Sequence, residues 1–153
     1  MKKLHSGHVE VLVARLFCFR KHMIVPNVSW GWGLGHEADM IIVGEGNKVT
    51  EVEIKVTLAD LKNDFKKGHN HKSKMIGRLY YAFPESMLKR GLPLIPKSCG
   101  IIIIVERNGG WKAELYRMVR YKKDYNGIST EQLVELLRLG VMRVWSLKEH
   151  NNR

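Results

Sequence analysis

Polar and apolar side chains alternate along residues 49–56, and a short apolar run precedes them at residues 40–43. The connection between the two runs, residues 44–47, contains glycine and asparagine, so the pattern predicts a β-hairpin. Residues two apart on a strand point to the same side, which gives the second strand one apolar and one charged face. The apolar face consists of Val52, Ile54 and Val56, and the charged face of Glu51, Glu53 and Lys55.

Apolar positions spaced three and four apart predict helices elsewhere in the chain. The first covers residues 6–20, the second begins at Thr57 and stops at Gly68, and the last follows Ser129. Ser6, Thr57 and Ser129 are the expected N-terminal caps. The last helix should pack on the sheet through Leu133, Leu136, Leu137, Val141 and Val144.

Further strands are predicted at residues 23–30, 78–83, 100–105 and 111–117, and a short helix should end near Arg90. Pro26 indicates that the first of these strands lies at an edge or carries a bulge. The run of four isoleucines at residues 101–104 is apolar on both faces, which is typical of a strand in the sheet centre. A turn at residues 108–110 predicts that the last two strands form an antiparallel pair.

The charged face of the hairpin requires a chemical interpretation. Asp39 lies on the partner strand, within sequence reach of a place beside Glu53 and Lys55. Two carboxylates next to a lysine can hold a divalent cation and a water that attacks a phosphodiester. The alternative is the solvated side of an amphipathic hairpin. The spacing of the three residues, followed directly by a lysine-rich helix, favours the active site.

The same spacing carries a family resemblance. Asp39, followed 14 positions later by Glu53-Ile54-Lys55, resembles the core motif of the PD-(D/E)xK nuclease superfamily, with Ala38 in the variable proline position. The superfamily implies an α/β fold with a restriction-endonuclease-like core, in which α-helices flank a mixed central β-sheet. It also implies Mg2+-dependent cleavage of DNA, although some members have lost catalysis.

A narrower resemblance extends from about residue 37 to residue 105. The segments at residues 52–65, 69–72 and 79–85 are similar to the MmcB-like branch and to related phage-borne proteins. This resemblance implies a role in DNA repair or in the processing of mobile-element and phage DNA.

The superfamily motif implies a role for each matching residue. Asp39 and Glu53 would ligate Mg2+ or Mn2+ with the backbone carbonyl of Ile54, and Lys55 would orient the attacking water. Glu10 is the candidate for the acidic residue that the first helix often adds to this site. An acid placed favourably in the first turn of a helix explains Glu10 equally well.

Three neighbouring residues are left open. Glu37 and Glu51 are in phase with the charged face, so either could support the site or bind a second metal ion, although an exposed strand end is the commoner outcome. His36 could carry a proton, but a lone loop histidine is more often incidental.

The charge of the chain indicates a polyanionic partner. The 153 residues carry 26 lysines and arginines against 15 aspartates and glutamates, a net charge of +11, and are expected to form a single domain, 1–153. The expected DNA-phosphate contacts are Lys62, Lys66, Lys67, His69, His71, Lys72 and Lys74. A second cluster at residues 117–123 is either a DNA contact or an exposed connection, and Trp30 and Trp32 are expected to pack in the core rather than to stack on bases.

Other features narrow the class of protein. Cys18 and Cys99 lie in apolar runs and are expected to be buried free thiols, and the seven histidines lack zinc-site spacing. The sequence shows no signal peptide and no membrane span, so a soluble, cytoplasmic protein is expected.

The sequence therefore predicts a Mg2+- or Mn2+-dependent deoxyribonuclease that hydrolyses phosphodiester bonds. The alternative is a catalytically inactive DNA-binding protein that keeps the nuclease fold. An RNA-directed nuclease is disfavoured only by the resemblance, and a homodimer is open because two symmetric cuts would need one.

Overall fold

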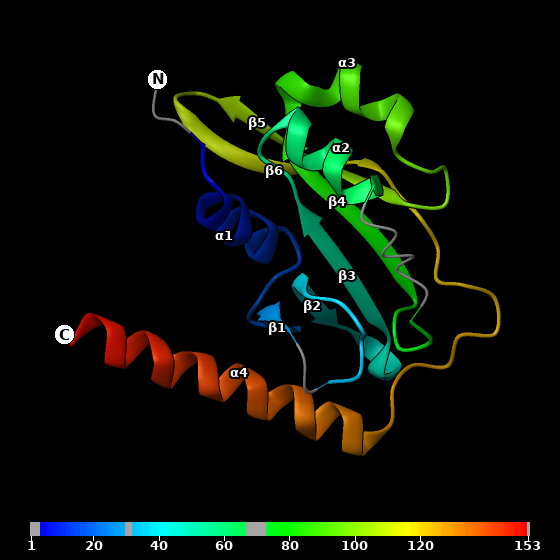
Figure 1. The fold of residues 1–153 in the computed structure, drawn as a ribbon, viewed down its shortest axis with the longest axis vertical. Helices are drawn as coiled ribbons and strands as arrows, with labels where there is room; N and C mark the ends of the chain where they lie inside the picture. Colours follow the sequence, from blue (N-terminus) through cyan, green and yellow to red (C-terminus); the bar gives the residue numbers. More distant parts are fainter. Residues whose placement is uncertain (1–3, 30–31, 67–72, 153) are drawn as a thin grey trace.

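The computed structural model describes residues 4–29, 32–66 and 73–152, and its centre is a six-stranded mixed β-sheet. The strands lie across the sheet in the order in which they occur in the chain (Figure 1). They are β1 (Met23–Val28), β2 (Ala38–Val43), β3 (Val49–Ile54), β4 (Arg78–Pro84), β5 (Gly100–Arg107) and β6 (Gly110–Arg117). β1, β2 and β3 form an antiparallel meander, β3, β4 and β5 are parallel, and β6 returns antiparallel to β5.

Helices cover both faces of this sheet, which confirms the α/β class. They are α1 (Ser6–Leu16), α2 (Leu58–Lys66), α3 (Leu88–Gly91) and α4 (Thr130–Asn151), with short 3-10 turns η1 (Glu45–Asn47), η2 (Glu85–Met87) and η3 (Leu92–Leu94). α1 packs through Val9 and Val13 on one face, and α2 packs through Leu61 on the other. α2 and α3 lie in the two crossover connections that make β3, β4 and β5 parallel.

Two of the three predicted N-terminal caps are confirmed, whereas the predicted cap and the predicted end of the first helix are wrong. The Thr57 hydroxyl accepts a hydrogen bond from the Asp60 amide at 3.1 Å, and Ser129 and Gln132 form a reciprocal capping box at α4. The N-cap of α1 is His5, without a side-chain hydrogen bond, so Ser6 already belongs to the helix. α1 ends at Leu16 instead of residue 20 because Cys18 adopts a left-handed backbone conformation, with φ 54°.

The strand predictions agree with the sheet order, with one refinement. β1, with Pro26, is an edge strand as expected, and it ends at Val28. The isoleucine run in β5 is buried on both faces, but β5 is the fifth strand and not the central one. Two neighbouring strands and helices on both sides are sufficient to bury it.

The expected packing of α4 is wrong for most of its apolar stripe. Leu136 is fully buried, whereas Leu137, Val141 and Val144 are 45%, 57% and 52% exposed. At 22 residues α4 is about 33 Å long, whereas the six residues of β1 span about 20 Å. The helix therefore extends beyond the strand on which it packs, as Figure 1 shows.

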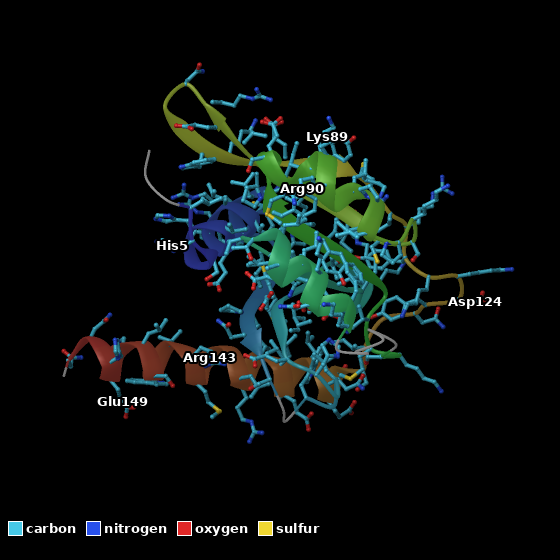
Figure 2. All side chains as sticks on the ribbon, turned by 45° about the horizontal axis from the view of Figure 1, so that its top comes forward. His5, Lys89, Arg90, Asp124, Arg143 and Glu149 are labelled. Carbon is cyan, nitrogen blue, oxygen red and sulfur yellow. The ribbon has the colours of Figure 1, made fainter. Side chains whose placement is uncertain are left out.

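The link between α4 and β1 is nevertheless specific. Arg143, on α4 (Figure 2), donates to the carbonyl oxygen of Asn27 at 2.6 Å, and Gly140 faces Val25. The buried side of α4 is thus centred on Leu136 and Gly140 instead of on the predicted stripe.

Two other predictions concern the thiols and the membrane. Both cysteines are free; Cys99 is buried as expected, and Cys18 is half-buried. Across residues 4–29, 32–66 and 73–152, no helix combines the length and apolarity that crossing a membrane requires.

Candidate active site

The candidate site begins where β2 and β3 separate. The ladder between the two strands ends at the pair Met40 and Val52. Beyond this pair, Oδ2 of Asp39 accepts a hydrogen bond from the backbone amide of Ile54 at 2.7 Å. The carboxylate of Asp39 thus takes the place of a backbone partner and is fixed beside the end of β3.

Lys55 joins this carboxylate to two others. Its Nζ lies 2.7 Å from Oε2 of Glu53, 3.0 Å from Oδ1 of Asp64 and 3.8 Å from Oδ2 of Asp39. The backbone amide of Lys55 donates to the carbonyl of Ala82 on β4 at 2.9 Å, which holds this residue beside the sheet. The structure therefore brings the predicted Asp39, Glu53 and Lys55 into one cluster.

Asp64 is a member that the sequence pattern missed. Its carboxylate contacts Lys55 and accepts a hydrogen bond from the Tyr81 hydroxyl at 3.0 Å. The signal was its position three residues after Leu61, on the flank of the buried side of α2. Tyr81 occupies the place on β4 that is paired with Glu53.

The interpretation of the charged face as a solvated surface is wrong. Glu51 is 0% exposed and Glu53 is 4% exposed. Nε2 of His36 lies 2.6 Å from Oε1 of Glu51, so His36 is not an incidental loop residue. Only Glu37 is exposed, as expected of a residue just outside a strand.

Burial and charge together shift the protonation of Glu53. Removal from water, with the nearby negative charges of Asp39 and Glu51, outweighs Lys55 and raises the pKa of Glu53 from 4.5 to about 7. Burial alone would lower the pKa of Lys55, but Glu53, Asp64 and Asp39 raise it above its ordinary value. Near neutral pH the proton on Glu53 is therefore easily displaced, whereas Lys55 stays charged.

Glu10 approaches the cluster from α1. Its side chain is half-buried, and burial followed by the negative charge of Asp39 raises its pKa. Glu10 therefore interacts electrostatically with Asp39 of the cluster.

The donor set fits a hard divalent cation. Asp39 and Glu53 present carboxylate oxygens at the end of β3, where the carbonyl of Ile54 also lies. Among the described residues, no group forms a hydrogen bond with Oε1 of Glu53, although this atom is buried. A buried carboxylate oxygen of this kind is a natural ligand for a cation.

The expected DNA-binding residues divide into two groups. Lys62, Lys66 and Lys74 are exposed. Lys67, His69, His71 and Lys72, and likewise Trp30, lie outside the described residues. Figure 2 shows Lys89 and Arg90 on α3, beside α2, where they add positive charge that the sequence pattern did not assign.

The second basic cluster has a partly structural role. Arg117 donates to the backbone carbonyls of Cys99 at 2.9 Å and Pro96 at 2.7 Å, so it fixes the loop before β5. Arg120, Lys122 and Lys123 are exposed. Trp32 is buried and its indole donates to the carbonyl of Gln132, which confirms the prediction of core packing for this residue.

Fold and site together define an α/β protein with a six-stranded mixed sheet and a carboxylate–lysine cluster at the junction of β2 and β3. The sequence model of the family described as DNA repair protein MmcB-like matches residues 5–148. The chain therefore belongs to the MmcB-like family of DNA repair proteins, which confirms the narrower resemblance.

A solved structure supports the fold. The SPO1766 protein of unknown function from Silicibacter pomeroyi is similar with a TM-score of 0.67 and 19% sequence identity, over 98% of this chain and 96% of that chain. A comparison with curated proteins finds no match.

Proposed function

We propose that this protein is a divalent-metal-dependent deoxyribonuclease that hydrolyses phosphodiester bonds during DNA repair. The observation that carries the proposal is that the carboxylates of Asp39 and Glu53 both lie within ion-pair distance of the Lys55 ammonium. A purely structural ion pair would need one carboxylate, whereas this lysine has three.

Asp39 and Glu53 would hold Mg2+ or Mn2+, with the Ile54 carbonyl and Glu10 completing the protein ligands. When bound, the cation lowers the pKa of a coordinated water and neutralises charge on the scissile phosphate. The hydrogen bond from the Ile54 amide fixes the orientation of Asp39 before any ligand binds.

Lys55 supplies a positively charged ammonium group to the proposed active site. Its ammonium carries three donors, so it can orient a water and also contact a phosphate oxygen as negative charge develops there. Asp64, held by Tyr81, positions the ammonium from the side of α2. We therefore assign Asp64 and Tyr81 as positioning residues.

DNA would reach the site over the lysine-rich surface of α2. Lys62 and Lys66 are exposed on the helix that contributes Asp64, and Lys74 follows before β4. The excess of 11 positive charges supports binding to a polyanion. The sequence prediction that Lys67, His69, His71 and Lys72 contact DNA phosphates remains part of this proposal.

The test is cleavage of labelled single-stranded, duplex and branched DNA with Mg2+, Mn2+ or EDTA. Lys55→Ala and Asp39→Ala should lower metal-dependent cleavage at least about a hundredfold, because each removes charge stabilisation at the reacting phosphate. Lys112→Ala, which removes an exposed lysine from β6, is the matched control and should cleave normally.

Wild-type cleavage rates in either site variant would overturn the assigned roles. Salt-sensitive DNA binding without any metal-dependent product would instead support the inactive DNA-binding alternative.

A further inference from the structure

A group of three side chains with possible metal-ligand atoms lies beside the proposed catalytic cluster and shares Glu53 with it. One ligand atom from each of His36, Glu51 and Glu53 falls within 4.8 Å of the other two. The side chains of these three residues are 8%, 0% and 5% exposed. Glu51 and Glu53 come from one face of β3, and His36 comes from the segment before β2.

The spacing of these atoms is compatible with ligands of one cation. Ligand atoms lie about 2.1 Å from a divalent transition metal, so neighbouring ligands are about 3 Å apart and opposite ones about 4 Å apart. Nε2 of His36 and Oε1 of Glu51 are 2.6 Å apart, which is close to the separation of neighbouring ligands. Glu53 supplies the third ligand atom, which lies within 4.8 Å of the other two.

The buried oxygen of Glu53 is an independent indication of a ligand. Oε2 of Glu53 contacts Lys55, whereas no described residue forms a hydrogen bond with Oε1. Leaving a buried carboxylate oxygen without a partner costs free energy unless a ligand supplies the missing interaction.

We propose that His36, Glu51 and Glu53 bind a divalent transition-metal ion, with Mn2+ preferred over Mg2+, next to the Asp39 site. The imidazole carries the preference, because nitrogen ligands suit transition metals and Mg2+ favours oxygen ligands and retained waters. Glu53 is common to both sites, so a cation on His36 and Glu51 fixes the carboxylate that the catalytic metal also needs. Its effect on cleavage rests on the proposed nuclease function, whereas its binding does not.

The decisive experiment counts bound Mn2+ by electron paramagnetic resonance, without DNA. Wild type should bind two Mn2+ per chain, of which an excess of Mg2+ displaces one. His36→Ala should bind one. His22→Ala is the matched control, because His22 contacts the Phe17 carbonyl away from the site, and it should still bind two.

A spin-echo measurement on the wild-type protein keeps the test independent of variant folding. Direct coordination by His36 should produce a 14N coupling to Mn2+ that changes when histidine is labelled with 15N. This coupling should persist in His22→Ala.

The outcomes separate this proposal from the proposed function. One Mn2+ per chain, lost in Asp39→Ala and unaffected by His36→Ala, would overturn the second site and leave the nuclease proposal intact. Two Mn2+ with nitrogen coupling but no cleavage of any DNA would support the site and count against the nuclease. Absence of nitrogen coupling would overturn the site directly.

Discussion

Glu53 is the residue at which the requirements of folding and of chemistry conflict. The fold removes it from water, and the chemistry proposed for it requires a negative charge. As a result of burial, the pKa of Glu53 is about 7 instead of the ordinary 4.5. At high pH Glu53 is ionised in both the folded and the unfolded protein. Holding this charge in the buried site instead of in water lowers the free energy of unfolding by about 3 kcal/mol.

The pH dependence of stability follows from this shift. Because the pKa of Glu53 is raised on folding, its contribution is most favourable below pH 4.5 and is lost as the pH rises to about 7 and beyond. In EDTA, Glu53→Gln should therefore be more stable than wild type, by up to about 3 kcal/mol at high pH and by little at low pH. Denaturant unfolding across this range measures the difference.

Glu37→Gln provides the control, because it neutralises an exposed carboxylate near the same strands. A Glu53→Gln advantage that does not grow with pH would contradict the assigned shift.

At the scale of single residues, the sequence predicted those site residues that lie on one hairpin. The period of a strand and the length of one hairpin are sufficient to bring Asp39, Glu53 and Lys55 together. Asp64 and His36 come from a helix and a loop folded against the sheet, and no local period encodes that contact. The burial of Glu51 was missed for the same reason.

At the level of elements, α2 links helix stability to the site. Thr57 caps the helix two residues after Lys55, and Asp64 lies on its inner side, so any loosening of α2 reaches the lysine. The helix caps could be predicted from the sequence because a cap involves residues three apart. The packing of α4 could not be predicted, because it depends on how far β1 extends beneath the helix.

Two caps of the same type make a matched comparison. Thr57→Ala and Ser129→Ala each remove a side-chain acceptor for a helix amide, at 3.1 Å and 3.2 Å. Each should lower the free energy of unfolding by about 1 kcal/mol. Only Thr57→Ala should also slow DNA cleavage, because α4 contributes no residue to the proposed site.

Thermal unfolding and cleavage rates of the two variants decide this prediction. Equal loss of cleavage in both would indicate that general destabilisation, rather than the position of α2, controls the rate.

For the whole molecule, the net charge of +11 should control the affinity for DNA and its dependence on salt. Each phosphate contact releases counterions, so affinity should fall steeply and linearly on a log–log plot against salt. The net charge could be predicted from composition alone, but which lysines are exposed on α2 could be seen only in the fold.

Lys62→Ala should weaken DNA binding and reduce the slope of that plot by about one. Lys112→Ala, which removes the same charge from β6, should leave the slope unchanged. Fluorescence anisotropy at several salt concentrations measures both, and equal slope changes would show that DNA does not favour the α2 surface.

The outer edge of β1 has a consequence for self-assembly. Pro26 lacks a backbone N–H, Asn27 departs from extended geometry with φ 50°, and Arg143 already occupies the Asn27 carbonyl. A strand from another copy could not form a continuous ladder of backbone hydrogen bonds with β1, because the ladder would be interrupted at Pro26 and Asn27. We therefore expect these features to disfavour extension of the sheet across copies through β1, which is one common route to aggregation.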